Sequence, residues 1–175
     1  MRDLATREKI FAFMRALGRS AKHPAKIYFT GGTTALLIGW RDSTVDIDLR
    51  FEPDHDELFR ALPILKEKLS VNIELASPPD FIPQLPGWED RSEFICREGV
   101  LDFFNYDLYS QALSKIERGH NQDVTDVNEM IARGFIETRK LIMLFESIEP
   151  NLYRYPSIDP ISFAEAVDRI TKDKL

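Results

Sequence analysis

The chain has 175 residues, a net charge of −6 and a single cysteine. This length fits one domain, or one domain with a small helical addition, and lets about 70% of the unfolded surface be buried. One cysteine excludes an intramolecular disulfide and offers no set of zinc ligands. We find no signal peptide and no apolar stretch long enough to span a membrane, so we expect a cytoplasmic protein without membrane contact.

The charges are unevenly distributed along the chain. Residues 1–26 carry seven Lys or Arg against two Asp or Glu, and an acidic region follows at residues 42–57. The acidic overall balance argues against general, charge-driven binding to DNA. A basic flank beside an acidic region would suit a polyanionic substrate, and a solvated helix face is the alternative interpretation.

Apolar periodicity predicts the elements of the first half of the chain. Helical spacing predicts a helix over residues 3–17, and the runs that follow predict strands over 27–30, 45–51 and 70–75, with a short helix over 33–38. Asp54, with Glu57 three residues later, has the pattern of a capping box and should begin another helix. Pro63 should kink that helix or split it in two.

The second half of the chain changes from strands to helices. Residues 77–88 form a proline-rich loop suited to a rim or lid, and a hairpin is expected from strands over 94–96 and 100–105. Helical spacing then predicts four helices, over residues 108–118, 123–133, 138–147 and 162–172. Strands followed by helices are typical of an α+β domain, with a sheet-containing core over 1–106 and a helical C-terminal part over 107–175 packed on it.

Asp46 and Asp48 are the strongest candidates for functional residues. Side chains two residues apart on a strand share a face, so both carboxylates should lie together while Val45, Ile47 and Leu49 take the opposite, buried face. Two such charges repel unless a cation lies between them, and clustered oxygen ligands suit Mg²⁺ or Mn²⁺. A solvated acidic strand face is the alternative interpretation.

Gly31 and Gly32 come before this strand, and the twelve residues 33–44 separate Gly32 from Val45. Glycines let backbone N–H groups approach an anion closely, and the helix expected after them directs its positive end to the same place. A phosphate-binding turn beside a metal-binding strand is typical of nucleoside triphosphate chemistry. The alternative is that the two glycines form an ordinary turn.

These residues resemble the signature of the nucleotidyltransferase superfamily that shares its core with DNA polymerase β. The resemblance implies a small mixed sheet with helices. It also implies that Gly31, Gly32 and Thr33 bind the nucleotide phosphates, and that Asp46 and Asp48 are catalytic metal ligands. The family places a third acid on a later strand, for which Glu74 is the first candidate and Asp102 the alternative.

A second cluster lies on the helix expected over residues 108–118 and on the helix after it. Helical spacing places Gln111, Lys115 and Arg118 on one face, and a lysine with an arginine can hold phosphate oxygens. We expect Lys115 to be reachable by solvent. Asp123 and Asp126 lie one turn apart at the start of the next helix, where they could orient the two basic side chains.

This second cluster resembles the later motifs of the AbiEii-type toxin nucleotidyltransferases. By that resemblance Lys115 and Arg118 contact the nucleotide, and Lys115 and Asp123 are catalytic, with Asp126 as an alternative to Asp123. The alternative from the residues alone is a surface helix followed by a capped one.

The resemblance implies a Mg²⁺- or Mn²⁺-dependent transfer of a nucleoside monophosphate from a nucleoside triphosphate to an acceptor. The acceptor would be an RNA 3′ end such as that of tRNA, or a protein hydroxyl. The setting would be a toxin–antitoxin pair or phage defence, with a cognate antitoxin as a partner. Two alternatives are a non-catalytic nucleotide-binding relative and an antitoxin-like protein, the second of which predicts a large exposed apolar patch on the helix over 135–145 or around Tyr153 and Tyr155.

Overall fold

The computed structural model describes residues 2–174, which form two compact units. One unit comprises the described residues up to Ser77 together with Ser92–Tyr106. The other comprises Pro78–Arg91 and the chain from Asp107 onward. The chain passes from the first unit to the second between Tyr106 and Asp107, and residues 78–91 group with the helical unit and not with the sheet.

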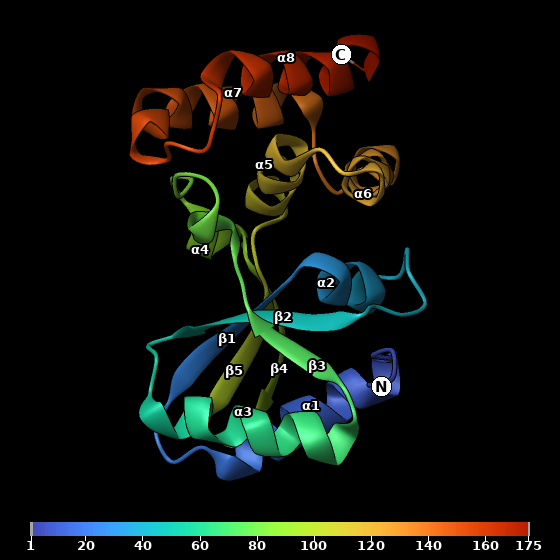
Figure 1. The fold of residues 1–175 in the computed structure, drawn as a ribbon, viewed down its shortest axis with the longest axis vertical. Coiled ribbons are helices and arrows are strands. Elements are labelled where there is room, and N and C mark those ends of the chain that lie inside the picture. The colour runs from blue at the N-terminus through green and yellow to red at the C-terminus, as the bar shows by residue number, and fades with distance from the viewer. Residues whose placement is uncertain (1, 175) are drawn as a thin grey trace. The chain divides into compact units, whose positions relative to one another are not determined.

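The first unit is built on a five-stranded mixed sheet in the order β3-β2-β1-β5-β4 (Figure 1). The strands are β1 (Ala25–Thr30), β2 (Asp46–Glu52), β3 (Asn72–Leu75), β4 (Glu93–Glu98) and β5 (Leu101–Asn105). β1 is antiparallel to β2 and parallel to β5, β2 is parallel to β3, and β4 and β5 form an antiparallel hairpin. The α+β fold with a small mixed sheet is thus confirmed.

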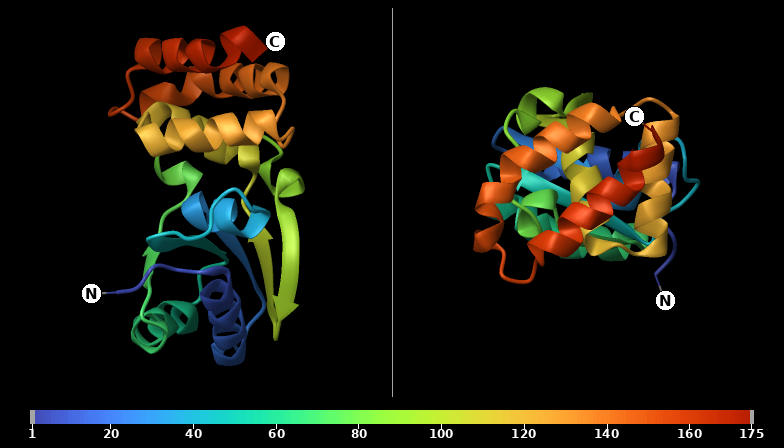
Figure 2. Two further views of the ribbon diagram at one scale, coloured as in Figure 1. Left: turned by 90° about the vertical axis from the view of Figure 1, so that its right-hand side faces the viewer. Right: turned by 90° about the horizontal axis from the view of Figure 1, so that it is seen from above.

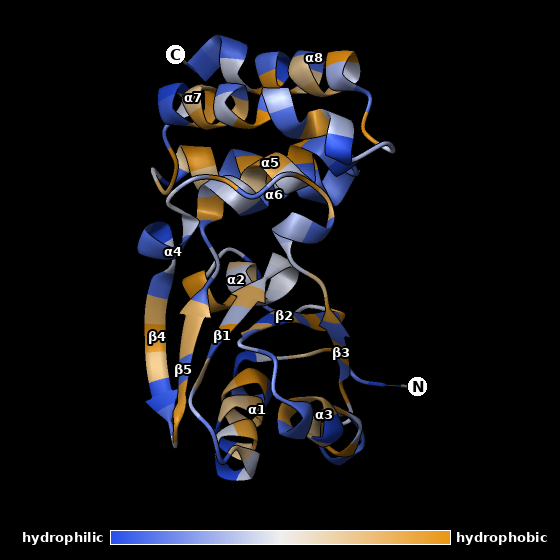
Figure 3. Cartoon of the chain, turned by 90° about the vertical axis from the view of Figure 1, so that its left-hand side faces the viewer, coloured by the Kyte–Doolittle hydropathy of each residue, from blue (hydrophilic) through white to orange (hydrophobic). Residues whose placement is uncertain are grey.

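The core of this unit lies on the side of the sheet that α1 (Arg7–Ser20) and α3 (Asp56–Leu69) cover (Figure 1). β2 shows why, because its residues alternate between buried and half-buried positions from Asp46 to Glu52. Ile47, Leu49 and Phe51 enter the core, so Asp46 and Asp48 face the other side of the sheet. The expected burial of Val45 on the core face is wrong, because Val45 precedes the first residue of β2 and is exposed. β4 differs from β2, since Figure 3 shows its apolar residues giving way to hydrophilic ones at the C-terminal end of the strand.

Two expected helix starts in this unit are wrong. α1 begins at Arg7 and not at residue 3, because the Thr6 side chain caps it by accepting from the Lys9 backbone N–H. α3 begins at Asp56 after His55, so Asp54 is not its cap. Glu57 makes no capping box, since its carboxylate accepts from the backbone N–H groups of Lys22 and His23.

Pro63 neither ends nor divides α3, which is assigned as one helix from Asp56 to Leu69. Leu58, Ala61, Leu62 and Leu65 are buried along the apolar face of the helix. Burial of this face stabilises the helix through tertiary packing, which can offset the backbone hydrogen bond that a proline removes.

The second unit is helical. It contains η1 (Pro78–Asp80), α4 (Trp88–Arg91), α5 (Leu108–Arg118), α6 (Asn121–Ala132), α7 (Thr138–Ile148), η2 (Glu149–Arg154), α8 (Pro160–Thr171) and η3 (Lys172–Lys174). Helix α5 contacts α6, α7 and α8, so it is the central helix of this unit (Figure 2). None of the helices in the part of the chain that the structure describes is long and apolar enough to cross a membrane.

Asp107 begins α5 and fixes the proline-rich segment to it. Its carboxylate caps the helix by accepting from the backbone N–H groups of Tyr109 and Ser110, each at 3.2 Å. Arg91 at the end of α4 forms a bidentate ion pair with the same carboxylate. Its Nε donates to Oδ1 at 3.0 Å and its Nη2 donates to Oδ2 at 2.8 Å. The Asp107 side chain is fully buried, so water competes little with this ion pair. The pair therefore holds residues 78–91 against the start of α5.

Candidate metal centre

Asp46, Asp48 and Glu74 lie together on one face of the sheet. β2 and β3 run parallel with Asp48 level with Glu74, so the period of two directs all three carboxylates to the same side. One oxygen from each residue lies within 4.8 Å of the others. Asp46 and Asp48 are half-buried and Glu74 is exposed, so the cluster is open to solvent on one side. Three convergent carboxylate oxygens form the kind of site that hard divalent cations prefer.

Glu74, and not Asp102, is the acid that completes this cluster in the structure. Asp102 on β5 makes two hydrogen bonds with Arg97 of β4, at 2.6 and 2.9 Å. The hydrogen bond with Arg97 lowers the pKa of Asp102 more than partial burial raises it. Asp102 is therefore held in an ion pair across the hairpin, away from the three clustered acids.

The two glycines start α2 (Gly31–Ile38) directly beside Asp48. Gly31 has a φ of +61°, a conformation that residues with a side chain rarely adopt. A Cβ at Gly31 would lie 2.7 Å from Asp48 Oδ2, and a Cβ at Gly32 would overlap the Thr44 hydroxyl. Only glycine therefore lets the N-terminus of this helix approach the acidic strand so closely.

Thr33 does not direct its hydroxyl to solvent. The side chain is fully buried, and Oγ1 donates to the backbone carbonyl of Asp46 at 3.3 Å. Thr33 thus joins α2 to β2, and any contact it makes with a phosphate would come from its backbone N–H.

Asn72 is a residue of this site that the sequence analysis missed. It pairs with Asp46 across the two parallel strands and lies two residues before Glu74, on the same face. Its side-chain amide donates to Asp46 Oδ1 at 2.6 Å and to Glu74 Oε1 at 3.0 Å. The alternation of Asn72 and Glu74 on one strand was visible in the sequence, but the partner at position 46 depends on strand pairing.

The second predicted cluster is assembled within the helical unit. Lys115 on α5 donates to Asp126 Oδ2 at 2.8 Å and approaches Asp123 Oδ1 at 3.5 Å. The guanidinium of Arg118 bonds both oxygens of Asp123, at 2.7 and 2.5 Å. The expected pairing of these bases with these acids is thus present.

The expected exposure of Lys115 is wrong. Its side chain is only 6% exposed, whereas that of Arg118 is 50% exposed. Lys115 lies on the buried side of α5 because two aspartates of α6 compensate its charge there. Burial alone would raise the pKa of Asp123, but the hydrogen bond from Arg118 and the charge of Lys115 outweigh it, so this pKa is lowered.

Single apolar side chains, and not a defined patch, are exposed in the two regions named for the partner-binding alternative. Phe135, Met143 and Tyr153 are exposed, whereas Tyr155 is partly buried and its hydroxyl donates to the Pro79 carbonyl at 2.7 Å. Single exposed apolar side chains are common on soluble proteins. They do not by themselves identify a partner surface.

Comparison with known proteins gives one match. The family model described as "Nucleotidyltransferase of unknown function" (DUF6036) matches residues 6–168. No curated protein and no solved structure is significantly similar to the chain. The match supports the resemblance to the nucleotidyltransferase superfamily and covers both clusters of candidate residues. It does not extend to the AbiEii-type toxins.

Proposed function

Because the chain belongs to this family of nucleotidyltransferases, we propose that it transfers a nucleoside monophosphate from a nucleoside triphosphate to an acceptor hydroxyl. The acceptor oxygen would attack the α-phosphorus and the bond to the β-phosphate oxygen would break. Pyrophosphate would leave and the hydroxyl proton would pass to solvent. The observation that carries this proposal is the convergence of Asp46, Asp48 and Glu74 beside the Gly31 turn.

The donor set supports a divalent metal at this centre. Asp46, Asp48 and Glu74 would hold Mg²⁺ or Mn²⁺, which when bound would polarise phosphate oxygens and offset their charge. The three acids are otherwise like charges held close together, an arrangement that a cation stabilises.

The start of α2 would bind the phosphates. Backbone N–H groups at a helix N-terminus favour anions, and Gly31 and Gly32 leave no side chain in the way. Thr33 would contribute its backbone N–H while its hydroxyl keeps the helix against β2.

The roles of the residues in the second cluster rest on the resemblance to the toxin nucleotidyltransferases. Arg118, with a half-exposed side chain, would contact nucleotide phosphates. Lys115 is buried, so contact with a nucleotide would require it to exchange a carboxylate partner for phosphate. Asp123 would be the late catalytic acid. An RNA 3′ end, such as that of tRNA, or a protein hydroxyl would be the acceptor, in a toxin–antitoxin or phage-defence setting with a cognate antitoxin.

Label transfer tests this function directly. The protein is incubated with each nucleoside triphosphate, labelled at the α- or the γ-phosphate, together with Mg²⁺ or Mn²⁺, total RNA and a protein extract. Nucleotidyl transfer moves the α-label, and not the γ-label, to RNA or protein. Movement of the γ-label alone would identify a kinase and contradict the proposal.

Asp48→Asn is the control for this assay, because it removes one charge from the centre while keeping the size of the side chain. Transfer should fall by about 10²-fold or more, the scale of losing one preorganised electrostatic contact. Transfer by the variant at the rate of the unaltered chain would remove the acidic centre from the reaction.

A further inference from the structure

We propose that Asn72 is the positioning residue of the acidic centre, and that it sets how tightly this centre binds a divalent ion. This inference rests on the proposed function, because it takes Asp46 and Glu74 to be metal ligands. Asn72 itself would not touch the ion and would act through these two carboxylates.

The hydrogen bonds of Asn72 determine which way its amide faces. The Nδ2 group donates to Asp46 and to Glu74, while Oδ1 accepts from Arg2 Nη1 at 3.1 Å. Turning the amide over would place its oxygen against two carboxylates and its nitrogen against a guanidinium. The surroundings therefore favour one orientation, in which both hydrogens of the amide are donated to the acids.

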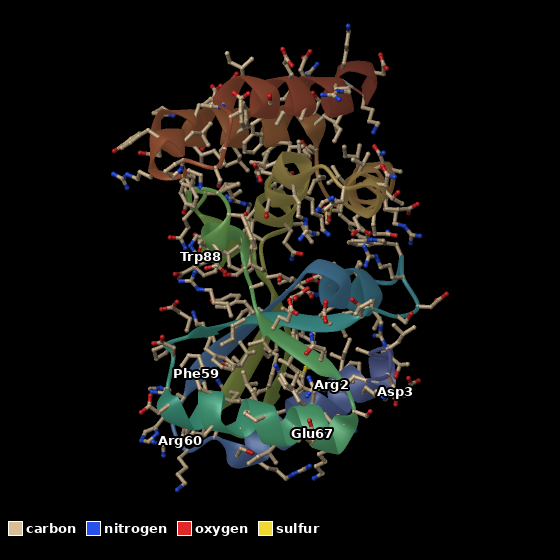
Figure 4. The ribbon with its side chains drawn as sticks, viewed as in Figure 1. Arg2, Asp3, Phe59, Arg60, Glu67 and Trp88 are labelled. Carbon is tan, nitrogen blue, oxygen red and sulfur yellow. The ribbon has the colours of Figure 1, made fainter. Side chains whose placement is uncertain are left out.

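Arg2 is itself held in place. Its Nη2 pairs with Glu67 Oε1 of α3 at 2.9 Å, and Figure 4 shows both side chains at the same end of that helix. A continuous series of contacts thus leads from α3 through Arg2 and Asn72 to two acids of the centre. The helix and the two strands together fix the position of the amide.

A neutral donor between two carboxylates has a specific consequence. It lowers the repulsion between Asp46 and Glu74 without removing either negative charge, and each carboxylate keeps its other oxygen for a ligand. The acids are then held close together before an ion arrives, so less ordering is needed on binding. Partners of this kind usually change metal affinity by about 10- to 100-fold when they are removed.

Mn²⁺ binding provides the test, with calorimetry and electron paramagnetic resonance as measurements on the full chain. Asn72→Ala and Asn72→Leu both remove the donor, and the second keeps the size of the side chain on β3. Each should weaken Mn²⁺ binding by about 10- to 100-fold. Asn128→Ala is the matched control, because Asn128 is an exposed asparagine of α6 that contacts Lys174 and should leave the affinity unchanged.

Thermal unfolding separates positioning from a general structural role. Without metal, the Asn72 variants should melt within a few degrees of the unaltered chain, whereas the rise in Tm at a given Mn²⁺ concentration should be much smaller. Variants that melt far lower without metal but bind Mn²⁺ with unchanged affinity when folded would show a structural role and overturn the proposal.

The same experiment distinguishes this inference from the proposed function. If the unaltered chain binds no Mn²⁺, the acidic centre is not a metal site and both fail. If the unaltered chain binds Mn²⁺ and the Asn72 variants bind it equally well, the metal centre stands and the role of Asn72 is contradicted.

Discussion

Gly31 and Asp48 approach each other so closely that no side chain fits between them. A Cβ built on Gly31 would lie 2.7 Å from Asp48 Oδ2, well inside the van der Waals contact distance. Gly31 also has a φ of +61°. Position 31 therefore requires a glycine for two separate physical reasons. One is the backbone conformation, and the other is the lack of space for a side chain beside Asp48.

Gly31→Ala and Gly134→Ala together separate these two reasons. Gly134 has a φ of +75° and no atom within 4 Å of a Cβ, so its alanine variant carries backbone strain of about 1–2 kcal/mol only. Gly31→Ala adds the displacement of Asp48 and should also weaken Mn²⁺ and nucleotide binding. Chemical denaturation and calorimetry measure the two effects, and equal metal affinity in both variants would refute the role of the contact.

Asp48→Ala should abolish Mg²⁺-dependent binding of a nucleoside triphosphate while the chain stays folded. Removing one of three repelling acids relieves repulsion in the metal-free protein, so the free energy of unfolding should not fall. Fluorescence titration with a labelled nucleotide, with and without Mg²⁺, measures the loss. Unchanged affinity in the presence of metal would count against Asp48 as a ligand.

A matched pair of variants tests the third acid. Glu74→Gln should weaken Mn²⁺ binding, because Glu74 contributes one oxygen to the cluster. Asp102→Asn removes a carboxylate from the same sheet that is paired with Arg97, and it should leave Mn²⁺ binding unchanged. The reverse result in calorimetry would return the role to Asp102.

The sequence predicted the parts of this protein that depend on local pattern. Alternation on β2 predicts which side Asp46 and Asp48 face, and the strand at 70–75 predicts that Glu74 lies opposite Val71 and Ile73. The capping box at Asp54 and Glu57 is wrong because the Glu57 carboxylate is used by a loop 34 residues earlier. A contact of that separation leaves no trace in local spacing.

The same limit explains why the burial of Lys115 and the contacts of Asn72 could not be predicted from the sequence. Helical spacing places Lys115 on a stripe with Arg118, but only the packing of α6 on α5 decides that Lys115 is buried against two aspartates while Arg118 stays half-exposed. The function of Asn72 depends on pairing between β2 and β3 and on Arg2 near the start of the chain. Both are properties of the tertiary structure.

Lys115→Met should strongly destabilise the helical unit. Removing one member of a buried ion pair is strongly destabilising, by about 3–5 kcal/mol. Here Asp126 is fully buried and Asp123 nearly so, and Lys115 bonds the first at 2.8 Å. Denaturant unfolding measures the loss. Lys140→Met is the control, because the Lys140 ammonium lies over the Tyr109 ring and pairs with no acid of this cluster.

A double variant identifies the origin of that loss. Lys115→Met combined with Asp126→Leu removes both charges and should recover much of the stability, since replacing a buried ion pair by apolar side chains is often neutral. No recovery in the double variant would mean that Lys115 stabilises the unit through contacts other than Asp126. Transfer activity of the same double variant would show whether the pair of Lys115 and Asp126 is needed for more than folding.

Asp123 should make the helical unit sensitive to acid. Its pKa in the folded chain lies below the ordinary value of about 3.9, because Arg118 and Lys115 stabilise the carboxylate more than burial opposes it. A lowered folded pKa contributes stability that is fully present above the unfolded value. That stability is lost as the pH falls from the unfolded value through the folded one.

The free energy of unfolding, measured by urea denaturation between pH 6 and 2, should therefore fall more steeply for the unaltered chain than for Asp123→Asn. Asp56→Asn, at an exposed aspartate of α3 in the other unit, is the control and should retain the full slope. If the free energy of unfolding of Asp123→Asn fell with pH as steeply as that of the unaltered chain, the ion pair with Arg118 would not lower the pKa of this carboxyl group in solution.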